Sequence, residues 1–202
     1  MSDLSMPLSK NFTLGEFLRS GTAERIPALK SEQENPPQNI VENLKYLVEK
    51  TLQPVRDEIG APIRINSGYR CPSVNKLVGG SSTSQHCLGE AADCEISRNF
   101  LSMPEFEPIR ANIRSGVMDL TGKPLKDDIS ENLFLFALIC LNLEKLDIDQ
   151  VIHEYGTDFG DPAWVHVASS NRQNRRQILF VGQYTDGKYL KPSVEEALAY
   201  LT

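Results

Sequence analysis

The chain has 202 residues, enough for one domain with a substantial core, and its 40% hydrophobic and 24% charged residues are typical of a globular protein. Its 21 Lys and Arg against 27 Asp and Glu give a formal net charge of -6, which disfavours nucleic acid as a partner. No apolar run approaches the roughly 18 residues of a membrane helix. The four cysteines form no CxxC pair and are interpreted as buried thiols rather than a disulfide framework.

The first part of the chain is predicted to be mainly helical. Residues 11–19 place apolar side chains at helical spacing and predict a short amphipathic helix. Residues 21–37 contain three prolines and predict a loop. Between residues 40 and 59 an apolar residue recurs every three or four positions, which predicts a helix with one buried stripe, kinked at Pro54 and ended by Gly60.

Short strands are predicted after that helix, at residues 62–67 and 90–96, because apolar and polar side chains alternate there. Residues 79–84, rich in Gly and Ser, predict the loop between them. Residues 97–126 show no sustained periodicity and are interpreted as an insertion of loops and short helices. One hypothesis for this insertion is that it covers the cleft and limits substrate length.

The last part of the chain is predicted to complete a sheet. The expected elements are a buried helix at 130–143, two antiparallel strands at 149–155 and 163–169, a strand at 177–181, and a helix capped by Ser193 within a C-terminal extension at 183–202. The chain shows neither an internal repeat nor a linker. We therefore expect a single α+β domain over residues 1–202, with an insertion at about 97–126.

The chain has only three histidines, so a site that needs two of them has little choice. His86 follows the Gly/Ser loop, and Asp93 lies on the non-apolar face of the next strand. His166 lies on one face of a later strand whose other face is apolar. If the two strands are neighbours, these side chains converge as the three protein ligands of a catalytic zinc site. A hydrogen-bonded surface pair of His and Asp is the alternative interpretation of the same spacing.

A longer pattern surrounds these residues. Ser84-x-His86-x-x-Gly89-x-Ala91-x-Asp93 resembles the SxHxxGxAxD signature of the zinc D-Ala-D-Ala carboxypeptidase and L-Ala-D-Glu peptidase family, the LAS metallopeptidases. The resemblance continues in the segments Ser-Gly-Tyr-Arg at 67–70, Asp-Gln-Val-Ile-x-Glu at 149–154 and Trp-x-His at 164–166. It implies an α+β fold in which a small antiparallel sheet, flanked by helices, holds one zinc ion.

The same resemblance assigns roles to individual residues. His86, Asp93 and His166 would be the zinc ligands, and Arg70 would bind a substrate carboxylate or carbonyl through its guanidinium. Ser84 either forms a hydrogen bond near the site or only stabilises its turn.

The general base is less clearly marked. Many relatives carry an acidic residue three positions before the last zinc histidine, where this chain has Ala163. Glu154 is the first substitute, because strand alternation places it on the face where a zinc cleft would lie. Asp161, in the loop before the strand that carries the last ligand, is the second candidate. The alternative that neither residue is the base stays open. His153 matches no ligand motif and is interpreted as a packed histidine.

The function that the resemblance implies is zinc-dependent hydrolysis of peptidoglycan stem-peptide bonds involving D-amino acids, by a D,D-carboxypeptidase or an endopeptidase. The alternative is a non-catalytic cell-wall-binding or virion structural module that retains the zinc fold, which the alanine at position 163 keeps open. Residues 1–10 show no signal-peptide pattern, so we expect synthesis in the cytoplasm and action on the cell wall, as for a phage-encoded endolysin or a virion-associated enzyme.

Overall fold

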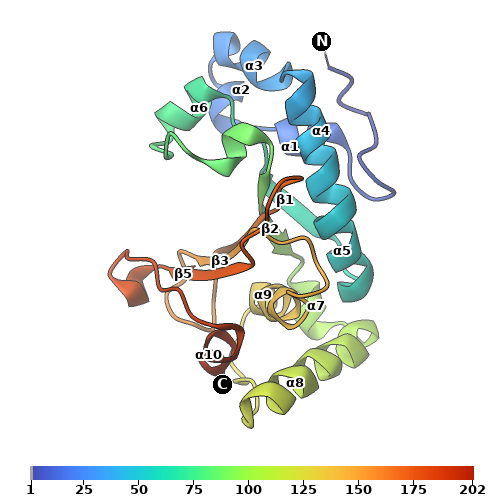
Figure 1. The fold of residues 1–202 in the computed structure, drawn as a ribbon. Coiled ribbons are helices and arrows are strands. Elements are labelled where there is room, and N and C mark those ends of the chain that lie inside the picture. Colours follow the sequence, from blue (N-terminus) through green and yellow to red (C-terminus); the bar gives the residue numbers. More distant parts are fainter. Residues whose placement is uncertain (1) are drawn as a thin grey trace.

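The computed structural model describes residues 2–202, which form a five-stranded sheet with helices on both sides (Figure 1). The strands are β1 (Ile63–Ser67), β2 (Ala91–Ile96), β3 (Gln150–Glu154), β4 (Trp164–Ala168) and β5 (Gln177–Val181). The helices before β2 are α1 (Leu14–Leu18), α2 (Gly21–Glu24), α3 (Pro27–Glu34), α4 (Gln38–Leu47), α5 (Gln53–Ile59), α6 (Pro72–Leu77) and the 3-10 helix η2 (Gln85–Leu88). Those after β2 are α7 (Asn99–Ser102), α8 (Glu107–Thr121), α9 (Glu131–Leu141) and α10 (Val194–Ala199), with 3-10 turns η3 (Pro104–Phe106) and η4 (Gln183–Thr185).

The sheet has the strand order β1-β2-β4-β3-β5. β2 and β4 are antiparallel neighbours, which is the condition for the predicted ligands to converge. β1 and β3 also pair antiparallel with their neighbours, whereas β5 pairs with β3 in parallel. The mostly antiparallel sheet flanked by helices confirms the predicted α+β class.

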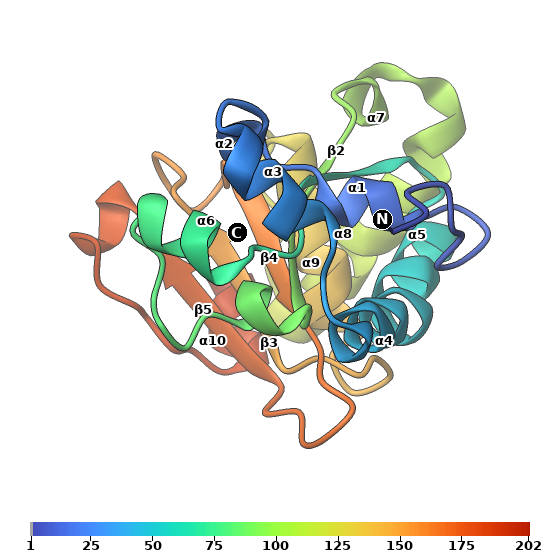
Figure 2. The same cartoon turned by 90° about the horizontal axis from the view of Figure 1, so that it is seen from above.

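Helix α9 forms the centre of the hydrophobic core. Residues 132–140 are all buried, because the helix packs against the sheet on one side and against α5, α8 and α10 on the others. A helix enclosed in this way is apolar all round, as the sequence pattern at 130–143 predicts. Figure 1 shows α8, α9 and α10 on one side of the sheet, with α1 to α3 and α6 on the other. In the view from above (Figure 2), α3 and α6 lie in front of the sheet. Within residues 2–202, no helix is both long enough and apolar enough to span a membrane.

One expectation in the first part of the chain is corrected by the structure, and another is refined. Residues 21–37, predicted to be a loop, contain α2 and α3, because Pro27 occupies the first turn of α3, where a missing N–H costs nothing. The helix predicted between 40 and 59 is present as α4 and α5, joined by a π-helical turn at Val48–Leu52 just before Pro54. Gly60 ends it with a φ of 68°.

Residues 97–126, predicted to be loops and short helices, contain the 15-residue helix α8. Pro108 lies in its first turn and Gly122 ends it, so these residues bound the helix rather than interrupt it. At Gly116 an added Cβ would lie 3.0 Å from Leu141 Cδ1, so the glycine permits the close approach of α8 to α9. Because α8 packs against α9 and α10, it does not cover the cavity described below.

Candidate metal centre

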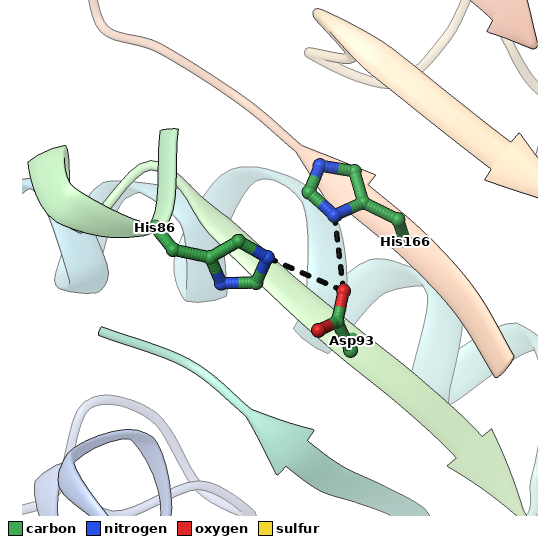
Figure 3. A group of neighbouring side chains, drawn as sticks. All are labelled: His86, Asp93 and His166. Carbon is green, nitrogen blue, oxygen red and sulfur yellow. Dashed lines mark hydrogen bonds and ion pairs between the residues drawn. The ribbon is translucent and has the colours of Figure 1, made fainter. Parts of the chain in front are cut away.

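Three side chains from three segments meet on the face of the sheet opposite α9 (Figure 3). Asp93 of β2 lies directly opposite His166 of β4 in the antiparallel register, and His86 comes from η2. His86 Nε2 lies 3.3 Å from Asp93 Oδ1, and His166 Nδ1 lies 3.0 Å from the same oxygen. The side chains are nearly inaccessible: His86 is 2% exposed, Asp93 8% and His166 7%. The cluster is therefore held away from bulk water.

The donor set fits a zinc ion. Two imidazole nitrogens and one carboxylate oxygen lie within 4.8 Å of one another. In tetrahedral zinc with bonds near 2.0–2.1 Å, two ligand atoms are separated by about 3.3 Å, close to the two spacings found here. Three protein ligands also leave a fourth position open, which is typical of catalytic rather than structural zinc.

A backbone carbonyl group fixes the orientation of the His86 ring. Its Nδ1 lies 2.7 Å from the carbonyl oxygen of Gly68. Because a carbonyl only accepts hydrogen bonds, Nδ1 carries the proton and the neutral ring turns an unprotonated Nε2 toward Asp93. Gly68 reaches this position because it packs on α1, where an added Cβ would lie 2.6 Å from the Phe17 carbonyl oxygen. The Ser-Gly-Tyr-Arg segment therefore holds the His86 ring in its orientation.

The backbone conformation explains why the signature has a glycine at position 89. Gly89 ends η2 in the left-handed region with a φ of 67°, and its N–H bonds back to the His86 carbonyl. An added Cβ would also lie 2.8 Å from the Ile40 carbonyl oxygen of α4. Both constraints select glycine, and they bring the chain from His86 directly into β2 and Asp93.

The three groups shift one another's pKa. Burial opposes ionisation of Asp93, but the two imidazoles beside it outweigh burial and hold the pKa of Asp93 below its usual value. Burial lowers the pKa of His86, against the pull of Asp93. For His166 burial also acts downward, but its hydrogen bond to Asp93 prevails and raises the pKa of His166. Asp93 is therefore ionised, which is the form in which a carboxylate binds a metal ion.

A cavity of about 650 Å³ opens over the cluster. It is lined by six of the seven residues that the sequence singles out as site residues: Arg70, Ser84, His86, Asp93, Glu154 and His166. Ser84 occupies the N-cap position of η2 without a side-chain capping hydrogen bond. Ile152 and Leu179 form an apolar wall of the same cavity.

Glu154 is half-buried in this cavity and is held by a tryptophan. The Trp164 indole N–H donates to Glu154 Oε2 at 2.6 Å, across the β3–β4 pair. Burial raises the pKa of Glu154, while the positive potential of His166 and the Trp164 hydrogen bond act in the opposite direction. Trp164 thus lies in the cavity wall rather than in the core.

Asp161 lies elsewhere. It is exposed and lines a different cavity, of about 740 Å³, together with Ala163 and residues of β2 and α9. The geometry therefore favours Glu154 over Asp161 as the carboxylate nearest the cluster. His153 is fully buried on the opposite face of β3, packed against Phe136 and Phe180, in line with its interpretation as a packed residue.

An ion pair at the cavity, between Arg175 and Asp149, is not predicted by the sequence patterns. Arg175 lines the cavity from the loop after β4, and its guanidinium pairs with the buried carboxylate of Asp149. Asp149 Oδ2 also accepts a hydrogen bond of 2.9 Å from the Gln85 side chain. Asp149 belongs to a sequence motif, but the loop that supplies Arg175 has no periodicity that would indicate its place.

A buried glutamine is a second residue without a sequence signal. Gln33 of α3 is 1% exposed, and its Nε2 donates to the carbonyl oxygens of Leu18 and Tyr69 at 3.0 and 2.6 Å. Its Oε1 accepts from the Cys71 N–H at 2.9 Å. Gln33 thereby fastens the segment that carries Arg70 to α1 and α3. Its location in a predicted loop concealed this role.

The fold and the site together define a class: an α+β protein with one candidate metal centre of two histidines and one aspartate, open to a cavity. Residues 10–117, more than half of the chain, match the model of the peptidase M15 family. The chain therefore belongs to the peptidase M15 family, which agrees with the resemblance found in its motifs. The matched range includes His86 and Asp93 and ends before β3 and β4. A search of curated proteins found no match.

Proposed function

We propose that this protein is a zinc peptidase that hydrolyses peptidoglycan stem-peptide bonds involving D-amino acids. The observation that carries the proposal is the set of His86, Asp93 and His166, with ligand-like spacing and one open side facing a cavity. Membership of the peptidase M15 family supports the reaction class. The D-amino acid substrate rests on the resemblance of the signature.

In the proposed mechanism His86, Asp93 and His166 would hold the zinc ion. Zinc bound there would lower the pKa of water and polarise a carbonyl group. Glu154 accepts the proton of the attacking water and delivers it to the leaving amine. Its raised pKa suits a group that must both take up and release a proton near neutral pH.

The remaining cavity residues position the substrate. The Trp164 hydrogen bond occupies Oε2 of Glu154, and we assign proton transfer to Oε1. Arg70 lines the cavity, and we assign its guanidinium to the substrate carbonyl or carboxylate. Ser84 lines the same wall and is proposed as a further hydrogen-bonding group.

The metal is tested first. Elemental mass spectrometry of the purified protein should find about one zinc per chain, and little in His86→Ala. His153→Ala is the matched control, because this histidine lies on the other face of the sheet, and it should retain the metal if it folds. Absence of tightly bound metal after zinc is supplied would overturn the proposal.

The base is tested by Glu154→Gln, with Asp161→Asn as its control. Cleavage of muropeptides, followed by chromatography and mass spectrometry, should fall by about 10²- to 10⁴-fold in Glu154→Gln with zinc content unchanged. Asp161→Asn should cleave at the parent rate. If the zinc-loaded parent leaves every muropeptide intact, the protein is a non-catalytic wall-binding or virion module instead.

The proposed substrate places the action of the protein at the cell wall. That the protein is an endolysin, phage-encoded or carried in a virion, stays a prediction. Lysis of cells from outside or after membrane permeabilisation by the parent, and not by Glu154→Gln, would support it. A protein that cleaves soluble muropeptides and leaves intact sacculi unchanged would contradict it.

A further inference from the structure

A second, smaller pocket adjoins the metal cavity. Its volume is about 260 Å³, and it reaches from Asp93 of the metal cluster to residues 19–22, which run from the end of α1 into the first turn of α2. Three residues, Arg70, Val78 and Asp93, line both cavities. The two cavities therefore adjoin at these three residues, beside the candidate metal centre.

The two arginines that line the pocket outnumber its one carboxylate, and the exposed Arg19 also borders a surface pocket with Glu16, Glu24 and Glu34. Arg19 and Arg70 line it, and neither takes part in the ion pairs found within residues 2–202. The Nε atom of Arg70 is buried and has no hydrogen-bond partner among those residues. Burying a charged donor without an acceptor is costly, so this geometry is suited to an anionic ligand. The one carboxylate in the lining, Asp93, is assigned to the metal.

The walls of the pocket are specifically shaped. The pairing of β1 with β2 shifts register between Ile65 and Ser67, so the consecutive residues Asn66 and Ser67 both line the pocket. Such bulges redirect side chains that would otherwise alternate between faces. On the opposite wall the Ser20 side chain accepts a hydrogen bond of 3.2 Å from the Ala23 N–H, which fixes the turn after Arg19.

We infer that this pocket is a substrate subsite for a carboxylate group and that Arg19 determines specificity there. The inference rests on the proposed function and extends it. The metal cavity has an apolar wall of Ile152 and Leu179, and Arg175 in its lining is paired with Asp149. The smaller pocket presents Arg19, Arg70 and four polar side chains. The preferred substrate therefore carries an acidic group some distance from the bond that is cut.

The probes are stem pentapeptides, L-Ala-γ-D-Glu-L-Lys-D-Ala-D-Ala, in which the D-Glu α-carboxylate or the C-terminal carboxylate is replaced by an amide. Their binding is measured by calorimetry in the zinc-loaded Glu154→Gln background, which keeps the peptides intact, and their cleavage is measured in the parent. Arg19→Ala removes the proposed contact, and Arg19→Lys keeps its charge. Arg25→Ala is the matched control, since Arg25 is an exposed arginine at the C-cap of α2, outside the pocket.

For one of the two carboxylates, amidation should weaken binding about tenfold or more, and this preference should disappear in Arg19→Ala. Arg25→Ala should keep the full preference, and Arg19→Lys part of it. If Arg19→Ala and Arg25→Ala bind every peptide alike, or no peptide binds, the subsite is wrong. Cleavage without the Arg19 effect overturns only the subsite, whereas the Arg19 effect on binding without cleavage overturns only the proposed function.

Discussion

At the scale of single residues, His153 shows how burial changes a titratable group that takes no part in the site. It is fully buried among aromatic rings, and the Tyr184 hydroxyl lies 2.6 Å from its Nδ1. Its Nε2 has no partner among the described residues. Burial therefore lowers the pKa of His153 to about 4.

This depressed pKa makes stability depend on pH. Between pH 6.5 and about 4 the unfolded chain binds a proton at position 153 that the folded protein does not, so stability is full above pH 6.5 and is lost as pH falls. The loss amounts to about 3 kcal/mol at most. In urea unfolding across this range, the unfolding free energy of the parent should fall relative to that of His153→Phe as the pH is lowered. A difference independent of pH would contradict this account.

Gly89 is the second prediction at this scale. Gly89→Ala should lower the free energy of unfolding by about 2 kcal/mol, since a side chain there is strained by the positive φ and meets the Ile40 carbonyl. Gly79→Ala is a matched control, because Gly79 has a φ of 71° but open space around its Cβ position. Urea unfolding should give the smaller loss for Gly79→Ala. Equal losses would show that the contact with α4 contributes nothing.

At the scale of elements, the segment that carries Arg70 is held by side-chain hydrogen bonds from α3. Gln33→Met keeps the length of the side chain but removes its three hydrogen bonds and leaves the Cys71 N–H without its acceptor. We expect a loss of about 2–4 kcal/mol in unfolding free energy. Gln38→Met, at an exposed position of α4, should cost under about 0.5 kcal/mol.

The same substitution separates stability from positioning. In Gln33→Met, kcat/KM for muropeptides should fall below the parent value even at a temperature where the variant is fully folded, because Arg70 lies beside two of the residues that Gln33 anchors. Circular dichroism establishes the folded fraction at the assay temperature. Parent-level kcat/KM in the folded variant would show that the segment is positioned without Gln33.

Local patterns predict the elements whose signals are periodic. The strand predicted at 177–181 matches β5, and alternation correctly places Val165 and Val167 on the core face of β4, opposite His166. The same reasoning fails for α3 and α8. A proline in the first turn of each is interpreted from the sequence as a residue that breaks helices, although it lies where the helix begins.

The site is predictable to a similar extent. His86, Asp93 and Glu154 follow from a motif and from strand alternation, and the structure brings all three to one cavity. Gln33 and Arg175 act through partners 38 and 26 residues away, Cys71 and Asp149. No local pattern in the sequence contains such a contact, so these two residues are found only in the folded chain.

At the scale of the whole molecule, the sheet separates two environments. One face packs on α9 and forms the main core, and the other carries the candidate metal centre beside a separate apolar cluster of Ile152, Leu179 and Val181. We propose that residues 1–202 form one domain in which the segments 97–126 and 183–202 are additions that complete the α9 side. Segment 97–126 would then contribute to stability without touching the site, whereas segment 183–202 also supplies Tyr189 to the wall of the metal cavity.

The C-terminal segment tests this proposal. Leu198 of α10 is fully buried within the main core cluster, and the Lys126 N–H donates to the Leu201 carbonyl at 3.1 Å. Leu198→Ala should lower the unfolding free energy by about 2–5 kcal/mol. Calorimetry should show one transition moved as a whole to lower temperature, with zinc content unchanged. Glu195→Ala, exposed on the same helix, should leave the transition in place. If the segment 183–202 folds independently, Leu198→Ala will leave the main transition where it is, and the single-domain proposal fails.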